Sequence, residues 1–189
     1  MSSLDIIQWT AVALGIAEVL LASVNKVWLY PTGIASILLS VYVLLVRDLY
    51  ADCLLHFYYL IMSIYGWIYW NRRQNKSEVR VTFSSKTDWI IVLVISFGGW
   101  ILLYLFLVYF TPSNTPVLDS WVSATGCAGM WLLARRKVEN WVLLNVSNAF
   151  AIPLLIYKDV YIMAGFTGFL FIVACFGYFK WKRLAYAVR

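Results

Sequence analysis

Trp141, Asn145 and Asn148 are the residues whose types and spacing best suit the binding of a small polar molecule. They stand at i, i+4 and i+7 in an apolar stretch, so an α-helix would place them on one stripe. An amide offers hydrogen-bond donors and an acceptor. Two amides above a tryptophan suit an aromatic ring that carries a ribosyl diol or a carboxamide. The spacing predicts a substrate-binding stripe, with hydrogen bonding between helices as the alternative.

A second candidate stripe lies in residues 54–70. Its members advance by three or four residues and so share one helical face: His56, Tyr59, Ser63, Trp67 and Trp70. Trp70 stands at the polar end of the stretch, which suits a residue at the membrane interface or at a gate. Trp67, Tyr59 and Ser63 lie deeper, which predicts that they line a pathway. His56 suits either packing or contact with a ligand.

Two further residues inside apolar stretches need a reason to be there. A carboxylate such as that of Glu18 costs about 2.5–3.5 kcal/mol near the centre of a membrane helix, so we expect it to face a cavity or a partner. A cationic aromatic ring is one such partner. The alternatives are a protonated carboxyl group bonded to a neighbouring helix, a side chain that reaches the inner interface, and a proton-coupling site. Pro153 predicts either a bend used in opening or a static kink.

Positioning these side chains requires helices that cross a bilayer. The chain has 189 residues, of which 63% are hydrophobic and 13% charged. Its apolar stretches are about as long as a membrane helix, and they alternate too weakly for a β-barrel. The sequence therefore predicts an all-α integral membrane protein with seven transmembrane helices: residues 6–23, 27–46, 54–70, 89–110, 118–134, 138–157 and 161–181.

The charges predict how the chain is oriented in the membrane. With seven spans, one side of the bilayer receives most of the lysines and arginines, and the other side receives only Arg47 and Lys158. Basic loops stay in the cytoplasm, so we expect the N-terminus outside and the C-terminus inside. The net charge of +6 is thus a topology signal, and it requires no nucleic-acid partner.

The sequence favours a protein that is not an enzyme. The three cysteines form no CxxC pattern, and His56 has no companions for a metal site, so we expect no metal and no cofactor. Hydrolase triads, P-loops and HExxH motifs are absent from the sequence. A membrane-embedded enzyme that uses Glu18 and His56 is one alternative, and a bundle that transports nothing is another.

The sequence also contains an internal repeat. When the chain is slid along itself so that Asp48 falls on Asp159, its two halves align without a gap, and Gly66 falls on Gly177 and Trp70 on Trp181. We expect a first repeat over residues 1–75, a connector helix over residues 86–110 and a second repeat over residues 116–185. One extra helix between two three-helix units gives both units the same sense in the membrane. Parallel repeats of this kind are typical of transporters whose site lies at the repeat interface near the midplane.

Two segments resemble the PnuC family of bacterial vitamin transporters. One is YGWIYW at the end of the third predicted helix, and the other is RKVENW at the start of the sixth. The resemblance extends over essentially the whole chain. It implies a single transmembrane domain with a 3+1+3 fold similar to that of SWEET proteins, located in the bacterial inner membrane.

The resemblance also implies a substrate and a mode of transport. The substrate would be nicotinamide riboside, taken up by facilitated diffusion and trapped by phosphorylation in the cytoplasm; thiamine or another vitamin is the alternative. The implied partners are the small-molecule vitamin, the lipid bilayer and further copies of the chain in a homo-oligomeric trimer.

Overall fold

The computed structural model describes residues 3–46, 50–72 and 80–187, and these residues are almost entirely helical. In the described ranges the one β-bridge pairs Thr82 with Lys137. The chain divides into two compact units, Met1–Val79 and Arg80–Arg189. The prediction of an all-α protein is confirmed over the described ranges.

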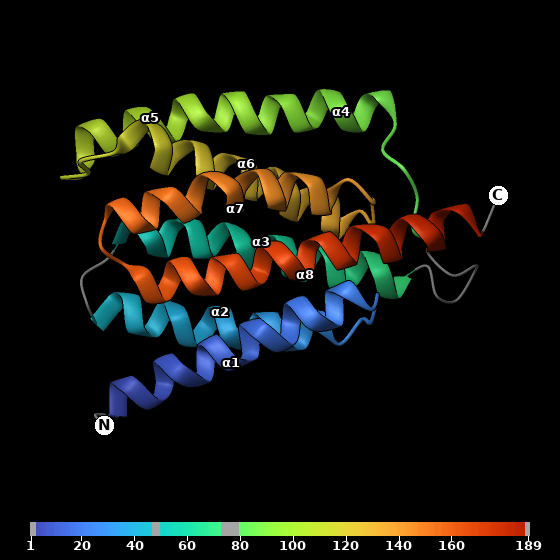
Figure 1. The fold of residues 1–189 in the computed structure, drawn as a ribbon, viewed down its shortest axis with the longest axis horizontal. Helices are drawn as coiled ribbons and strands as arrows, with labels where there is room; N and C mark the ends of the chain where they lie inside the picture. The colour runs from blue at the N-terminus through green and yellow to red at the C-terminus, as the bar shows by residue number, and fades with distance from the viewer. Residues whose placement is uncertain (1–2, 47–49, 73–79, 188–189) are drawn as a thin grey trace. The chain divides into compact units, whose positions relative to one another are not determined.

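The first unit contains three helices, α1 (Ser3–Ser23), α2 (Leu29–Val46) and α3 (Tyr50–Arg72). The helix α2 packs against both α1 and α3 (Figure 1). It begins at Leu29, later than the predicted start at Val27, because the chain first makes a turn in which Asn25 has a φ of 59°. Asp48, a predicted member of the repeat, lies outside the described residues.

The second unit begins with a long rod. In it α4 (Lys86–Leu93), the π-helix η1 (Val94–Gly98) and α5 (Gly99–Phe110) follow one another without a break (Figure 1). Three helices complete the unit: α6 (Pro116–Ala134), α7 (Asn140–Tyr157) and α8 (Tyr161–Tyr186). The helix α6 packs against the rod and against α7, and α7 packs against α8.

Five helical segments of the described chain are long and apolar enough to cross a membrane, with α4, η1 and α5 counted as one. The other two predicted spans are also helices, α3 and α6, but they fall outside that set. In α6 the reason is visible in its sequence, because small and polar residues replace large apolar ones along the face that packs in the unit. They include Ser120, Ala124, Thr125, Gly126, Ala128 and Gly129, all of which are buried.

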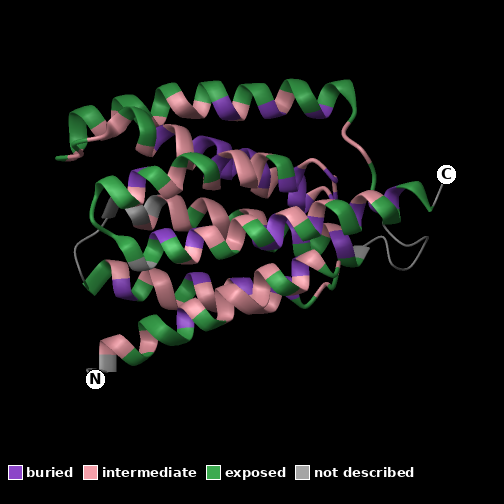
Figure 2. Cartoon of the chain, in the orientation of Figure 1, coloured by how far each residue is buried: buried purple, intermediate pink, exposed green. Residues whose placement is uncertain are grey.

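Burial separates helices that face other helices from helices that face outwards. Figure 2 shows buried residues concentrated along α6, whereas the α4–α5 rod is mostly exposed. Most exposed residues of the rod are large and apolar, and they include Ile90, Val94, Ile101, Leu102 and Phe110. An apolar surface of this extent suits contact with lipid.

The turn between α1 and α2 has the same backbone as the turn between α6 and α7. Asn25 has a φ of 59°, and Arg136, its partner in the repeat alignment, has a φ of 60°. In each turn the next residue donates its N–H to a carbonyl oxygen near the end of the preceding helix, at 3.0 Å. Ser36 Oγ donates to a carbonyl oxygen of α1 at 2.7 Å, and Ser147 Oγ donates to one of α6 at 2.8 Å. Positive φ at a non-glycine residue is uncommon, so its recurrence at matching positions indicates that the two turns are structurally equivalent.

Candidate functional site

A pocket of about 370 Å³ opens on the second unit, between α7 and α8. Its wall is mainly aromatic and aliphatic, with no charged side chain among the lining residues. These are Trp141, Val142, Asn145, Val146 and Ala149 from α7, and Cys175, Tyr178 and Phe179 from α8. A mostly apolar concavity with a few polar groups is the usual form of a small-molecule site.

Two polar atoms of the residues that line the pocket make no hydrogen bond within the described chain. Asn145 Nδ2 donates to Cys175 Sγ at 3.3 Å. Asn145 Oδ1 is buried and accepts no hydrogen bond within the described chain, and Trp141 Nε1 is buried and donates none. A buried polar group without a partner costs about 1–3 kcal/mol, so such groups need a reason to be retained. One unused acceptor and one unused donor therefore belong to residues that line a single pocket.

The indole of Trp141 is fixed by two other residues of the same unit. Trp181 stands edge-on to it, with ring centroids 5.7 Å apart and an interplanar angle of 89°. The opposing helix carries a glycine under the ring, since a Cβ at Gly177 would lie 2.6 Å from Trp141 Cε2. Both tryptophans are buried. The indole thus sits in a notch of α8 that only glycine provides.

The predicted stripe on α7 is only partly gathered at this pocket. Trp141 and Asn145 line it, and at the next turn the lining residue is Ala149, while Asn148 is half-buried outside the lining. The sulfur of Cys175 accepts the amide hydrogen bond of Asn145. Sequence reasoning also missed Tyr178, for which the only signal was its position next to the repeated Gly177.

The predicted stripe on α3 divides into buried and exposed residues. Ser63 is buried and its Oγ has no hydrogen-bond partner among the described residues, whereas Trp67 is 37% exposed. His56 and Tyr59 form an edge-to-face pair with centroids 6.1 Å apart. Trp70 has no exposed surface, and its predicted role at the membrane interface or at a gate stays a prediction.

Trp70 packs instead on the first turn of α2. Its ring is edge-on to Tyr30, with centroids 5.1 Å apart and an interplanar angle of 88°. A Cβ at Gly66 would lie 2.6 Å from Tyr30 Cε1. This arrangement repeats the one around Trp141, because Tyr30, Gly66 and Trp70 occupy the matching positions of the first repeat.

Glu18 lies at the crossing of α1 and α2. Its carboxyl group packs directly against Gly33, where a Cβ would lie 2.9 Å from Oε2. The side chain is half-buried. Pro153 is exposed within α7, which remains helical from Asn140 to Tyr157. The predicted contact of Glu18 with a substrate, and the predicted bend at Pro153, both stay predictions.

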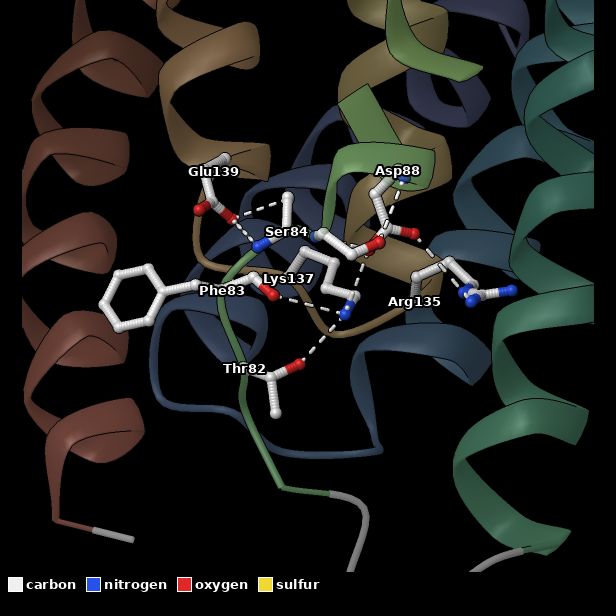
Figure 3. A network of polar contacts seen from close by, with 8 residues as sticks. Thr82, Phe83, Ser84, Asp88, Arg135, Lys137 and Glu139 are labelled. Carbon is white, nitrogen blue, oxygen red and sulfur yellow. Dashed lines mark hydrogen bonds and ion pairs between the residues drawn. The ribbon is translucent and has the colours of Figure 1, made fainter. Parts of the chain in front are cut away.

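A polar network, shown in Figure 3, fixes the beginning of α7. The segment of residues 81–88, which we call the strap, pairs with the turn between α6 and α7. Thr82 N donates to Arg136 O at 3.2 Å, and Val138 N donates to Thr82 O at 3.1 Å. Glu139 accepts hydrogen bonds from Ser84 N at 2.9 Å and from Ser84 Oγ at 2.7 Å.

Asp88 completes the network at the other end of the strap. The buried carboxylate accepts from Ser85 N at 2.8 Å and forms the capping box of α4. It lies 3.2 Å from Lys137 Nζ and 3.8 Å from a guanidinium nitrogen of Arg135. Since Trp141 follows shortly after Glu139, the network holds the backbone from which the indole extends.

The far end of α7 is also held by an ion pair. Lys158, which directly follows the helix, lies 2.6 Å from an Asp119 carboxylate oxygen on α6. Ser113 Oγ donates to the other oxygen of that carboxylate at 2.7 Å. The pocket wall formed by α7 therefore has charged contacts beyond both of its ends.

The described residues hold no group of three or more metal-ligating side chains, and the three cysteines are free. The pocket can bind a molecule through an aromatic wall and an amide. It offers no nucleophile paired with a base.

Known proteins similar to this chain are transporters. The family described as nicotinamide mononucleotide transporter matches residues 5–183. The nicotinamide riboside transporter PnuC of Escherichia coli (strain K12) is 25% identical over 170 residues, which cover 76% of this chain and 71% of that protein. The protein of the same name from Shigella flexneri has the same identity and coverage. A crystal structure of the vitamin B3 transporter PnuC aligns with a TM-score of 0.75 at 22% identity, covering 96% of this chain and 82% of that one.

Proposed function

This chain belongs to the nicotinamide mononucleotide transporter family, and we propose that it carries nicotinamide riboside across the bacterial inner membrane. The resemblance to PnuC transporters seen in the sequence is confirmed by the family match and by the named relatives. The observation that carries the proposal is the α7–α8 pocket, whose wall combines Trp141 with the unused Asn145 carbonyl oxygen.

The chemistry of nicotinamide riboside suits this wall. Its pyridinium is flat and cationic, so it gains from aromatic faces. Its carboxamide has one acceptor and two donors, which complement the Trp141 Nε1–H and the Asn145 Oδ1. Pairing with both would remove two buried unpaired groups at once. Glu18, Asn148, Trp67, Tyr59, Ser63 and His56 remain proposed contacts elsewhere along the path.

We propose that transport follows the substrate gradient and that phosphorylation in the cytoplasm traps the transported substrate. The residues that line the pocket include no ionisable acid–base pair that could couple transport to protons. Measuring uptake into liposomes with and without an imposed proton gradient tests this. Accumulation that requires the gradient would contradict facilitated diffusion, and chemical conversion of the solute would favour the enzyme alternative.

The proposal includes the 3+1+3 arrangement, with α1–α3 and α6–α8 as repeats and the α4–α5 rod as connector. The matching turns, serine hydrogen bonds and ring-over-glycine contacts support it. The charge distribution supports an N-terminus outside and a C-terminus in the cytoplasm. Labelling of single added cysteines from each side of the membrane tests the orientation.

The central experiment replaces Asn145 by the residue that the first repeat carries at the same place. Ile34 is the repeat partner of Asn145, so Asn145→Ile removes the amide, and Ile34→Asn is the matched control. Binding of nicotinamide riboside to each purified variant is measured by calorimetry. We expect Asn145→Ile to weaken binding by about 5- to 150-fold, because substrate groups lose a hydrogen-bond partner. Ile34→Asn should bind as the unmodified protein does.

Competing solutes sharpen this experiment. Nicotinic acid riboside carries a carboxylate where nicotinamide riboside carries an amide, and no cation lines the pocket to pair with it. We expect it to bind more weakly. Thiamine lacks the carboxamide altogether. Tighter binding of thiamine than of nicotinamide riboside would favour the alternative vitamin, and normal binding by Asn145→Ile would place the site elsewhere.

A further inference from the structure

We propose that Gly177 is a positioning residue for substrate binding: its missing side chain allows the Trp141 indole to form the wall of the α7–α8 pocket. This inference rests on the proposed function, because it concerns the same pocket. Gly177 is not one of the residues that line it. Its effect would pass through the tryptophan ring.

The steric evidence comes from three atoms of one ring. A Cβ at Gly177 would lie 2.6 Å from Trp141 Cε2, 2.7 Å from Cζ2 and 2.8 Å from Cδ2. All three belong to a rigid bicycle, so the ring cannot relieve the contact by bending one end away. Carbon atoms prefer separations of about 3.5–4.0 Å. Any side chain at position 177 therefore has to move the whole indole or push α7 and α8 apart.

The neighbours of the indole restrict where it could go. Trp181, also buried, stands edge-on at 5.7 Å, and one helical turn separates it from Gly177 on α8. The backbone of Trp141 is held by the α7 start, where Glu139 is bonded to the strap. With its backbone and one side fixed, the ring can change mainly by rotating about its side-chain bonds. Because this ring lines the pocket, a rotation changes the wall that the substrate would meet.

The first unit contains the same contact of an aromatic ring with a glycine, at residues that do not line the α7–α8 pocket. Gly66 lies under Tyr30, and Trp70 stands edge-on to that ring at 5.1 Å. Tyr30 does not line the α7–α8 pocket. Gly66→Ala therefore makes a matched control: it imposes the same kind of clash on an aromatic ring at the equivalent place. Loss of packing should be common to both variants, whereas loss of affinity should be specific to Gly177→Ala.

The experiment compares Gly177→Ala and Gly66→Ala as purified full-length proteins in detergent. Affinity for nicotinamide riboside is measured per monodisperse molecule, alongside thermal stability and near-ultraviolet circular dichroism. We expect both variants to lose stability by similar amounts. Only Gly177→Ala should bind about tenfold or more weakly, and only it should change the dichroism of the Trp141–Trp181 pair. The difference in affinity between the two variants would not arise from a structural role shared by the two glycines.

Several results would overturn the inference. Normal affinity of Gly177→Ala despite altered dichroism would show that the position of the indole does not matter for binding. Equal loss of affinity in both variants would assign the effect to general destabilisation. If Gly177→Ala does not fold, a double variant that adds Trp141→Leu removes the clash and should fold. If the double variant does not fold either, the Trp141 ring is not the obstacle. If the unmodified protein does not bind nicotinamide riboside, the proposed function fails, and unchanged dichroism in Gly177→Ala would refute the positioning of the ring independently.

Discussion

The crossing of α1 and α2 in the first unit and the crossing of α6 and α7 in the second unit are filled from opposite sides. In the first unit the glycine is Gly33 on α2, and the carboxyl group of Glu18 on α1 packs against it. In the second unit the glycine is Gly129 on α6, and Leu144 on α7 packs against it, with Cδ2 2.8 Å from where a Cβ would be. Position 18 matches position 129, and position 33 matches position 144. The glycine and the larger residue have exchanged helices.

This exchange shows what the repeat has kept. In both units one helix offers a gap at this level and the other fills it, so the close approach of the backbones is retained. The chemical character of the filling group is not retained, since one unit has a carboxyl group where the other has an isobutyl group. The polar residues of the two units therefore differ in place, with Glu18 in the first and Asn145 in the second.

The largest expected effect comes from Gly33→Leu, which puts a second large side chain into the gap that Glu18 already fills. Overpacking a close helix crossing costs typically about 1–3 kcal/mol, and we expect the upper end because a whole side chain is added. The measurement is thermal stability and monodispersity of the purified variant. If Gly33→Leu is as stable as the unmodified protein, the Glu18 side chain moves out of the gap without a cost in stability.

Exchanging both residues of the first crossing should restore the stability that Gly33→Leu loses. Glu18→Gly combined with Gly33→Leu gives the first unit the pair that the second unit uses, a glycine facing a leucine. We expect the double variant to regain most of the stability that Gly33→Leu loses. No recovery would show that the two crossings differ in more than the direction of filling.

The second difference between the units is the strap. The turns at Asn25 and Arg136 share a backbone, and the β-bridge found in the described residues joins the strap to the second turn. Lys137 Nζ donates to Thr82 Oγ1 at 3.1 Å and to Phe83 O at 3.3 Å, in addition to its ion pair with Asp88. The matching lysine of the first turn, Lys26, is exposed.

Lys137→Met should therefore destabilise the protein far more than Lys26→Met. Removing one partner of a buried ion pair costs about 3–5 kcal/mol, and we expect about 2 kcal/mol because Arg135 and Ser85 still face the Asp88 carboxylate. Lys26→Met should stay within about 0.5 kcal/mol, as exposed substitutions usually do. Unfolding of both variants in the same detergent is the measurement. Equal effects would mean that the strap does not hold the second turn.

The sequence was sufficient to predict the helices, because the backbone N–H and C=O groups of each apolar stretch need a helix to be hydrogen-bonded in lipid. It was also sufficient to place Trp141 and Asn145 on one face, since helical spacing decides this. It could not identify the partners of that face, because Cys175 and Gly177 come from a different helix. The strap was missed although Ser85 and Asp88 have the spacing of a capping box, since its other contacts join residues that are far apart in the chain.

The smallest expected effect tests what the two units have in common. Ser36 and Ser147 each donate a hydrogen bond to a carbonyl oxygen of the preceding helix, at 2.7 Å and 2.8 Å. Those carbonyl groups lie inside helices, so they keep their backbone hydrogen bond when the hydroxyl is removed. Hydrogen bonds between membrane helices contribute about 0.6 kcal/mol on average, and we expect Ser36→Ala and Ser147→Ala each to lose about that much.

The two serines share no partner, so the double variant should lose about 1.2 kcal/mol. Thermal unfolding of the two single variants and the double variant measures all three values. A clearly larger loss at one serine would show that the units share the position of this hydrogen bond without sharing its energetic role.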